Sequence, residues 1–88
     1  MRAAPDLSPR LKSLLLRSWR RGTKEMDLIL GPYADARLAD MSETELADYE
    51  AMLSENDQDL YAWITGQLPT PATLGPALDP VRRFHGIG

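Results

Sequence analysis

Apolar residues recur along this chain at intervals of three and four, the spacing that places side chains on one face of an α-helix. No stretch alternates strictly between apolar and polar residues, as a half-buried β-strand would. The pattern predicts an all-α fold, a small single-domain bundle of about four to five short helices. A chain of 88 residues forms one domain at most.

The first two predicted helices meet at Gly22. Ser8 is a suitable N-cap for the first, with Pro9 in the first helical position, where a missing N–H costs nothing. Gly22 fits the C′ position, where helices favour the left-handed conformation that glycine adopts most easily. Thr23 is the expected N-cap of the second helix. Pro32 interrupts the apolar pattern of that helix and is expected to kink it or end it early.

Two further helices are predicted in the second half of the chain. Ser42 and Glu45 have the spacing of a capping box at the start of the third helix. Asn56 or Asp57 caps the fourth helix, and Gly66 ends it. The residues expected to face inward from the four helices are Leu11, Leu14, Leu15, Ser18, Met26, Ile29, Leu30, Tyr33, Leu46, Tyr49, Leu53, Leu60, Trp63 and Ile64.

The composition changes toward the C-terminus, where more than half of the seven prolines and half of the six glycines fall. Thr70-Pro71 and Asp79-Pro80 can each open a short helical turn, but Gly75-Pro76 is expected to exclude a long helix. We therefore divide the chain into an N-terminal extension at 1–7, a helical bundle at 8–68 that contains the junction at Gly22, and a Pro/Gly-rich C-terminal arm at 69–88.

The net charge of −3 conceals a strong asymmetry. Residues 1–25 hold seven basic and two acidic residues, a net +5, whereas residues 26–88 hold three basic and eleven acidic residues, a net −8. The basic residues gather around the Gly22 junction, where exposed backbone allows a partner to approach closely. A small nucleic-acid-binding or regulatory module that uses the basic N-terminal helix is the alternative. The acidic remainder would repel a nucleic acid or an anionic bilayer.

No group of residues predicts catalysis. The only histidine, His85, lies in the tail, and the chain has no cysteine. The acidic segment 55–59 lacks the glycine and the terminal glutamate of a calcium loop, so helix capping explains it better. Gly22 is isolated, which makes an FAD carrier the third and weakest interpretation. We expect no enzyme, no metal site and no cofactor of its own.

Two motifs in the sequence resemble the markers of a known family. Arg21, Gly22 and Glu25 match the marker Arg-Gly-x-x-Glu, which Asp27 follows two residues later. The segment DLYAW at 59–63 matches a second marker, in which an acidic turn leads to Asp-Leu-aromatic-x-Trp. With both markers at the right separation, the chain resembles the small succinate dehydrogenase assembly factors, also called FAD assembly factors.

The resemblance, which covers about residues 10–68, implies a bundle of about five helices that acts on a partner. That partner is the flavoprotein subunit of succinate dehydrogenase, and in some bacteria of fumarate reductase. Family members promote covalent attachment of FAD to a histidine of that subunit, so the FAD belongs to the partner. The short chain resembles a bacterial, hence cytoplasmic, member. It is expected to be a monomer that neither binds nucleic acid nor inserts into a membrane.

The family's functional residues map onto Arg21 and Gly22, with Glu25 beside them, and their neighbours Arg20 and Thr23 complete the expected partner-binding site. The hypothesis gives Arg21 a donor fork for the partner and gives Gly22 close backbone approach. In the structural alternative, Arg21 and Glu25 form a local ion pair worth about 0.3–0.5 kcal/mol. Gly22 would then serve only to end a helix.

Overall fold

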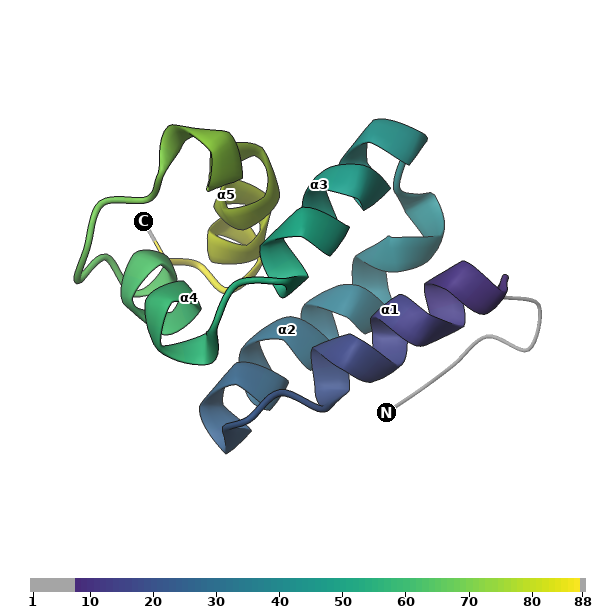
Figure 1. The fold of residues 1–88 in the computed structure, drawn as a ribbon, viewed down its shortest axis with the longest axis horizontal. Helices are drawn as coiled ribbons and strands as arrows, with labels where there is room; N and C mark the ends of the chain where they lie inside the picture. The colour runs from purple at the N-terminus through teal and green to yellow at the C-terminus, as the bar shows by residue number, and fades with distance from the viewer. Residues whose placement is uncertain (1–7, 88) are drawn as a thin grey trace. The chain divides into compact units, whose positions relative to one another are not determined.

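A computed structural model describes residues 8–87 of the chain (Figure 1). Its five α-helices are α1 (Pro9–Trp19), α2 (Lys24–Arg37), α3 (Glu43–Leu53), α4 (Asp57–Ile64) and α5 (Gly75–Phe84), with short 3-10 helices η1 (Leu38–Asp40) and η2 (Ala72–Leu74). The described residues contain no strand, which confirms the all-α prediction. None of the described helices has the length and apolarity to cross a bilayer. The predicted N-terminal extension at 1–7 lies outside the described residues.

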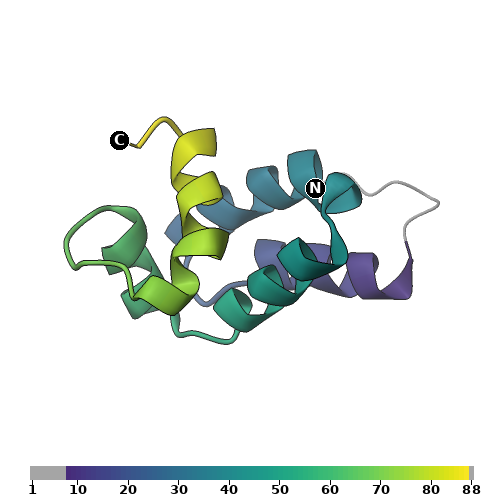
Figure 2. The same cartoon turned by 90° about the horizontal axis from the view of Figure 1, so that it is seen from above.

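The chain divides into two compact units, Met1–Met41 and Ser42–Gly88. In the first unit, α1 and α2 lie side by side, as Figures 1 and 2 both show. Both helices begin with the predicted caps. The Leu11 N–H donates to Ser8 Oγ at 3.2 Å, and the Met26 N–H donates to Thr23 Oγ1 at 3.3 Å. These side chains satisfy N–H groups that have no partner within a helix.

Pro32 does not end α2 early, because the helix continues to Arg37. A proline inside a helix removes one backbone hydrogen bond, and burial of the surrounding apolar face offsets that loss. The buried apolar residues of this unit are Leu14, Leu15, Met26, Leu30, Tyr33, Ala34 and Leu38. Ser18 is also buried, and its hydroxyl donates to the Leu14 carbonyl at 2.8 Å. Leu11 and Ile29 of the predicted core are only half-buried.

The second unit begins with the predicted capping box. The Glu45 N–H donates to Ser42 Oγ at 3.1 Å, and the Ser42 N–H donates to Glu45 Oε1 at 2.9 Å. Asn56 caps α4 by accepting from the Asp59 N–H at 2.8 Å. At its other end, α4 stops at Ile64, and Gly66 follows the C-cap Thr65 with a φ of 81°, a conformation that glycine adopts without steric cost. The capping interpretation of the acidic segment at 55–59 is therefore confirmed.

The expectation that Gly75-Pro76 excludes a long helix was wrong, because α5 begins at this pair and runs for ten residues. Pro76 stands in the first turn, where no backbone N–H has a partner within the helix, so its missing donor costs nothing. Pro80 does remove one internal bond. Burial of Ala77, Leu78 and Val81 offsets that loss as α5 packs against α3 and α4.

The other buried apolar residues of the second unit lie on α3 and α4. They are Leu46, Tyr49, Met52, Leu53, Leu60 and Ile64. Trp63, predicted to face inward, is half-buried. The predicted boundary between a bundle and an arm at 68/69 falls in the connection between α4 and η2, inside this unit.

Candidate partner-binding site

The predicted site lies in the turn between α1 and α2, which we call the junction, residues 20–23. Helix α1 ends at Trp19, and Arg20 is its C-cap with φ −123° and ψ 54°. Arg21 therefore occupies C′, and Gly22 lies one residue further from the helix than expected. No non-glycine residue among 8–87 has a positive φ, so the left-handed termination expected at C′ was wrong.

A carboxylate from the following helix holds the junction in place. The Arg21 N–H donates to Asp27 Oδ1 at 2.6 Å, across six residues of sequence and in a partly buried setting. Thr23 caps α2 one turn earlier, and the Asp27 N–H donates to the Thr23 carbonyl at 3.1 Å. Because an ionised acceptor makes a short and strong hydrogen bond, Asp27 fixes the backbone that carries Arg21.

Close packing of α1 against α2 also helps to hold the junction in place. Trp19, the last residue of α1, lies against Gly31 in the middle of α2. A Cβ at Gly31 would stand 2.5 Å from Trp19 Cε2 and 2.6 Å from Cε3, a distance that real contacts do not show. The absence of a side chain at Gly31 is therefore what lets the indole pack directly on the helix backbone.

The side chains of the site differ in their exposure. Arg20, Thr23 and Glu25 are exposed, as is Gly22, whereas Arg21 is half-buried. Within residues 8–87 the Glu25 carboxylate has no hydrogen bond or ion pair, so the local Arg21–Glu25 ion pair of the structural alternative is not formed. The exposed residues thus include one arginine, one glutamate and a glycine that has no side chain.

Sequence reasoning missed two parts of this arrangement. Asp27 was noted beside the Arg-Gly-x-x-Glu marker, but its hydrogen bond across the junction was not predicted. Gly31 was not singled out, although a glycine inside a helical pattern often has a packing reason. That signal identifies the position but not the Trp19 ring that occupies it.

The only histidine of the chain belongs to the second unit. His85 is exposed at the end of α5, where its ring meets Phe84 edge-on with centroids 5.1 Å apart. Among residues 8–87, no group of three His, Cys, Asp or Glu side chains is arranged to hold a metal ion.

Comparison with protein families shows to which family the chain belongs. The model of the family described as "Flavinator of succinate dehydrogenase" matches residues 12–85, which include the junction and all of α2 to α5. The chain belongs to this family. Its membership agrees with the resemblance that the two sequence motifs carry, and the match extends through α5 as well. No solved structure matches the chain.

Similar members of the flavinator family come from fungi, animals and bacteria. The chain is 40% identical over 88 residues to the mitochondrial succinate dehydrogenase assembly factor 2 of Aspergillus terreus, covering 99% of this chain and 29% of that protein. It is 36% identical over 86 residues to the Danio rerio protein of the same name, covering 94% and 54%. It is 36% identical over 69 residues to the FAD assembly factor SdhE of Acetobacter pasteurianus, covering 78% and 63%. The chain thus spans less than two thirds of the length of each.

Proposed function

We propose that this protein is an assembly factor that binds the flavoprotein subunit of succinate dehydrogenase and promotes covalent attachment of FAD to it. The proposal rests on the geometry of the junction in a chain that belongs to the flavinator family. The Asp27 hydrogen bond holds the junction backbone, and Arg20, Gly22 and Thr23 are exposed. A fixed turn loses little conformational entropy when it docks, which favours affinity.

In this proposal the factor acts by differential binding. Covalent attachment requires the isoalloxazine ring of FAD to be held against the accepting histidine of the flavoprotein. A factor that binds the aligned conformation more tightly than the others shifts the population of the flavoprotein toward it. The factor then needs no catalytic group and no cofactor, because the reacting FAD and histidine both belong to the partner.

Each residue of the expected partner-binding site has a distinct proposed role. Arg21 offers a planar donor fork to a carboxylate or carbonyl of the partner, and its half-buried position limits the freedom that it loses on binding. Exposed Gly22 lets the partner backbone approach closely. Glu25 accepts hydrogen bonds from the partner, and Arg20 and Thr23 flank the contact.

The proposal also includes an oligomeric state, a location and a second partner. The protein works as a monomer in a bacterial cytoplasm, where the flavoprotein of fumarate reductase is a second partner. The similarity to the Acetobacter pasteurianus FAD assembly factor supports the bacterial setting. The net charge of −8 over residues 26–88 disfavours binding to nucleic acid.

The test is co-expression of the chain with a succinate dehydrogenase flavoprotein subunit in a host that lacks its own assembly factor. Covalent FAD is measured as flavin fluorescence that stays with the denatured flavoprotein in a gel. Gly22→Leu should reduce this fluorescence to the level without factor, because the added side chain blocks backbone approach. Ala47→Leu adds the same side chain at an exposed position of α3 and should leave the fluorescence unchanged. Normal covalent FAD with a folded Gly22→Leu factor would refute the proposal.

A further inference from the structure

The outer side of the α1–α2 pair exposes two leucines. Leu16 of α1 is 40% exposed and Leu28 of α2 is 53% exposed. No other leucine, isoleucine, methionine or aromatic side chain among the described residues of the first unit, 8–41, is exposed. Single exposed leucines are common on protein surfaces, so the position of these two decides whether they have a role.

Both leucines lie within one helical turn of the place where α1 and α2 touch most closely. Leu16 precedes Trp19 by three residues, and Leu28 precedes Gly31 by three. Trp19, which is half-buried, packs on Gly31 and so joins these two positions across the helix pair. Residues three apart are neighbours on a helix surface. The two leucines therefore flank the indole on the side of the pair that faces away from the buried residues.

The same face carries exposed positive charge and adjoins the partner-binding residues. Lys12 and Arg20 stand four residues before and after Leu16, and Lys24 stands four residues before Leu28. All three basic side chains are exposed. Arg20 and Lys24 also flank the turn of the junction. We call this surface the leucine face and define it by Lys12, Leu16, Trp19, Arg20, Lys24 and Leu28.

The junction alone is too small to hold a partner protein. A stable interface covers about 800 Å² on each partner and involves roughly 20–30 residues a side. The centre of such an interface is apolar and its rim is polar. The expected partner-binding residues at 20–25 include no exposed apolar side chain. The leucine face supplies that missing apolar centre, next to the junction and on the same two helices.

We propose that the flavoprotein subunit covers the leucine face together with the junction and receives Leu16 and Leu28 in an apolar depression with an acidic rim. The inference rests on the proposed function and adds the chemistry of the partner surface to it. Three exposed basic residues around two leucines are complementary to carboxylates around an apolar depression.

Two other occupants fit the leucine face less well. An anionic bilayer would attract the basic rim, but exposed Glu25 stands one turn before Leu28 and would be pressed against like charge. A second copy of the chain would bring the same basic rim against itself, because a two-fold interface uses the same patch on both subunits. An acidic protein surface has neither conflict.

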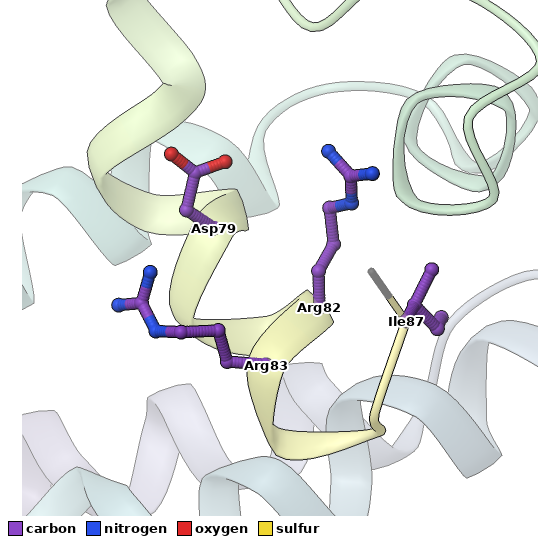
Figure 3. A pocket seen from close by; sticks show the side chains of 4 residues that line it. All are labelled: Asp79, Arg82, Arg83 and Ile87. Carbon is purple, nitrogen blue, oxygen red and sulfur yellow. The ribbon is translucent and has the colours of Figure 1, made fainter.

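A small open pocket at the end of α5 differs from the leucine face in its lining. Its volume is about 130 Å³, and Asp79, Arg82, Arg83 and Ile87 line it (Figure 3). Gly86 closes the helix there in a Schellman motif, in which the Ile87 N–H donates to the Arg82 carbonyl at 2.9 Å. Its two arginines share the pocket with an acid of the same helix, and Ile87, the one apolar lining residue, is half-buried. The pocket therefore offers no exposed apolar centre.

The test is the affinity of the full chain for the succinate dehydrogenase flavoprotein subunit, measured by isothermal titration calorimetry. The flavoprotein is prepared with non-covalent FAD from a host that lacks its own assembly factor. Leu28→Gln keeps the size of the side chain and should weaken binding about tenfold or more, because an amide replaces a buried apolar group. Leu28→Met should stay within about threefold of the wild type. Leu68→Gln makes the same change at a 51% exposed position of the second unit and should leave the affinity unchanged.

Salt tests the acidic rim of the proposed partner surface. Raising the ionic strength should weaken binding of the wild type, and should weaken binding of a Lys12→Gln, Lys24→Gln double variant less steeply. All substituted positions are exposed, so each variant should remain folded by circular dichroism. Equal salt dependence in the two chains would contradict a charged rim.

The outcomes separate this inference from the proposed function. Wild-type affinity in Leu28→Gln, with binding abolished in Gly22→Leu, would overturn the inference and leave the proposed function in place. Absence of binding by the wild-type chain would overturn both. Unchanged flavoprotein affinity in Leu28→Gln, combined with loss of binding to phosphatidylglycerol vesicles or of dimers in sedimentation, would identify a different occupant and would also overturn the inference.

Discussion

The junction between α1 and α2 and the end of α5 both place arginines beside a glycine, but different forces hold the two turns. At the junction, a side chain holds the backbone, because Asp27 accepts from the Arg21 N–H at 2.6 Å. At the end of α5 the backbone holds itself through a Schellman motif around Gly86. The first geometry therefore depends on a carboxylate, and the second depends on a conformation that only glycine adopts easily.

The two turns also differ in which charged side chains they leave exposed. At the junction, one oxygen of the Asp27 carboxylate is already bonded to a backbone N–H. The exposed acid next to the junction is Glu25, in the first turn of α2. At the end of α5 the backbone needs no carboxylate, and Asp79 remains in the pocket with both arginines. The two turns therefore offer different charge patterns.

The largest stability effect should come from removing the carboxylate at the junction. Asp27→Ala leaves the partly buried Arg21 N–H without its acceptor, which should lower the free energy of unfolding by about 1–3 kcal/mol. Asp27→Asn keeps an acceptor oxygen and should recover a large part of the loss. Asp40→Ala, at an exposed position of η1, should change stability by less than about 0.5 kcal/mol. Urea denaturation measures all three, and equal loss in Asp27→Ala and Asp40→Ala would show that the hydrogen bond does not hold the junction.

Filling the contact between Trp19 and α2 should have the next largest effect. In Gly31→Ala the new methyl group overlaps the indole, and overpacking of this kind costs about 1–3 kcal/mol. Higher helix propensity returns up to about 1 kcal/mol, so a net destabilisation of about 1–2 kcal/mol is expected. Tryptophan fluorescence should change in the folded state as Trp19 moves. A stabilised Gly31→Ala variant would mean that the two helices do not approach this closely.

The smallest stability effects are expected when alanine replaces the glycine at either end of α5. Gly86→Ala forces alanine into a left-handed conformation and should cost about 1 kcal/mol. Gly75→Ala makes the same chemical change at a helical φ of −52°, but Pro76 follows it and crowds a Cβ held in the helical region, so this variant should neither gain nor lose more than about 0.5 kcal/mol. Thermal unfolding followed by circular dichroism gives both values. An equal loss of stability in the two variants would count against the Schellman cap.

The local features of the fold were predictable from sequence, because capping depends on residues three or four apart. Ser8, Thr23, Asn56 and the Ser42–Glu45 capping box all act as expected. Helix α5 was missed because proline was counted as a helix breaker without regard to its position in the first turn. Its stability comes from an apolar face packed on α3 and α4, which local propensity does not reveal.

For the candidate site, the sequence predicted the residues but not their contacts, because these contacts depend on helix packing. The Arg-Gly-x-x-Glu marker identified Arg21, Gly22 and Glu25, but their contacts follow from how α1 and α2 pack. The Asp27 hydrogen bond spans a turn whose backbone path no propensity specifies, and the Trp19 contact joins residues twelve apart. Such contacts become visible only when the two helices are placed in space.

The most direct test of the central claim is the affinity of the Arg21→Ala factor for the flavoprotein subunit, measured together with its thermal stability. The junction backbone is held through the Arg21 N–H, which alanine retains, so the variant should stay folded, and its affinity is referred to the folded fraction. Loss of the guanidinium should weaken binding by about 2 kcal/mol or more, roughly thirtyfold in Kd, as expected for a central arginine. Unchanged affinity, or a large loss of stability with unchanged affinity per folded molecule, would contradict the account.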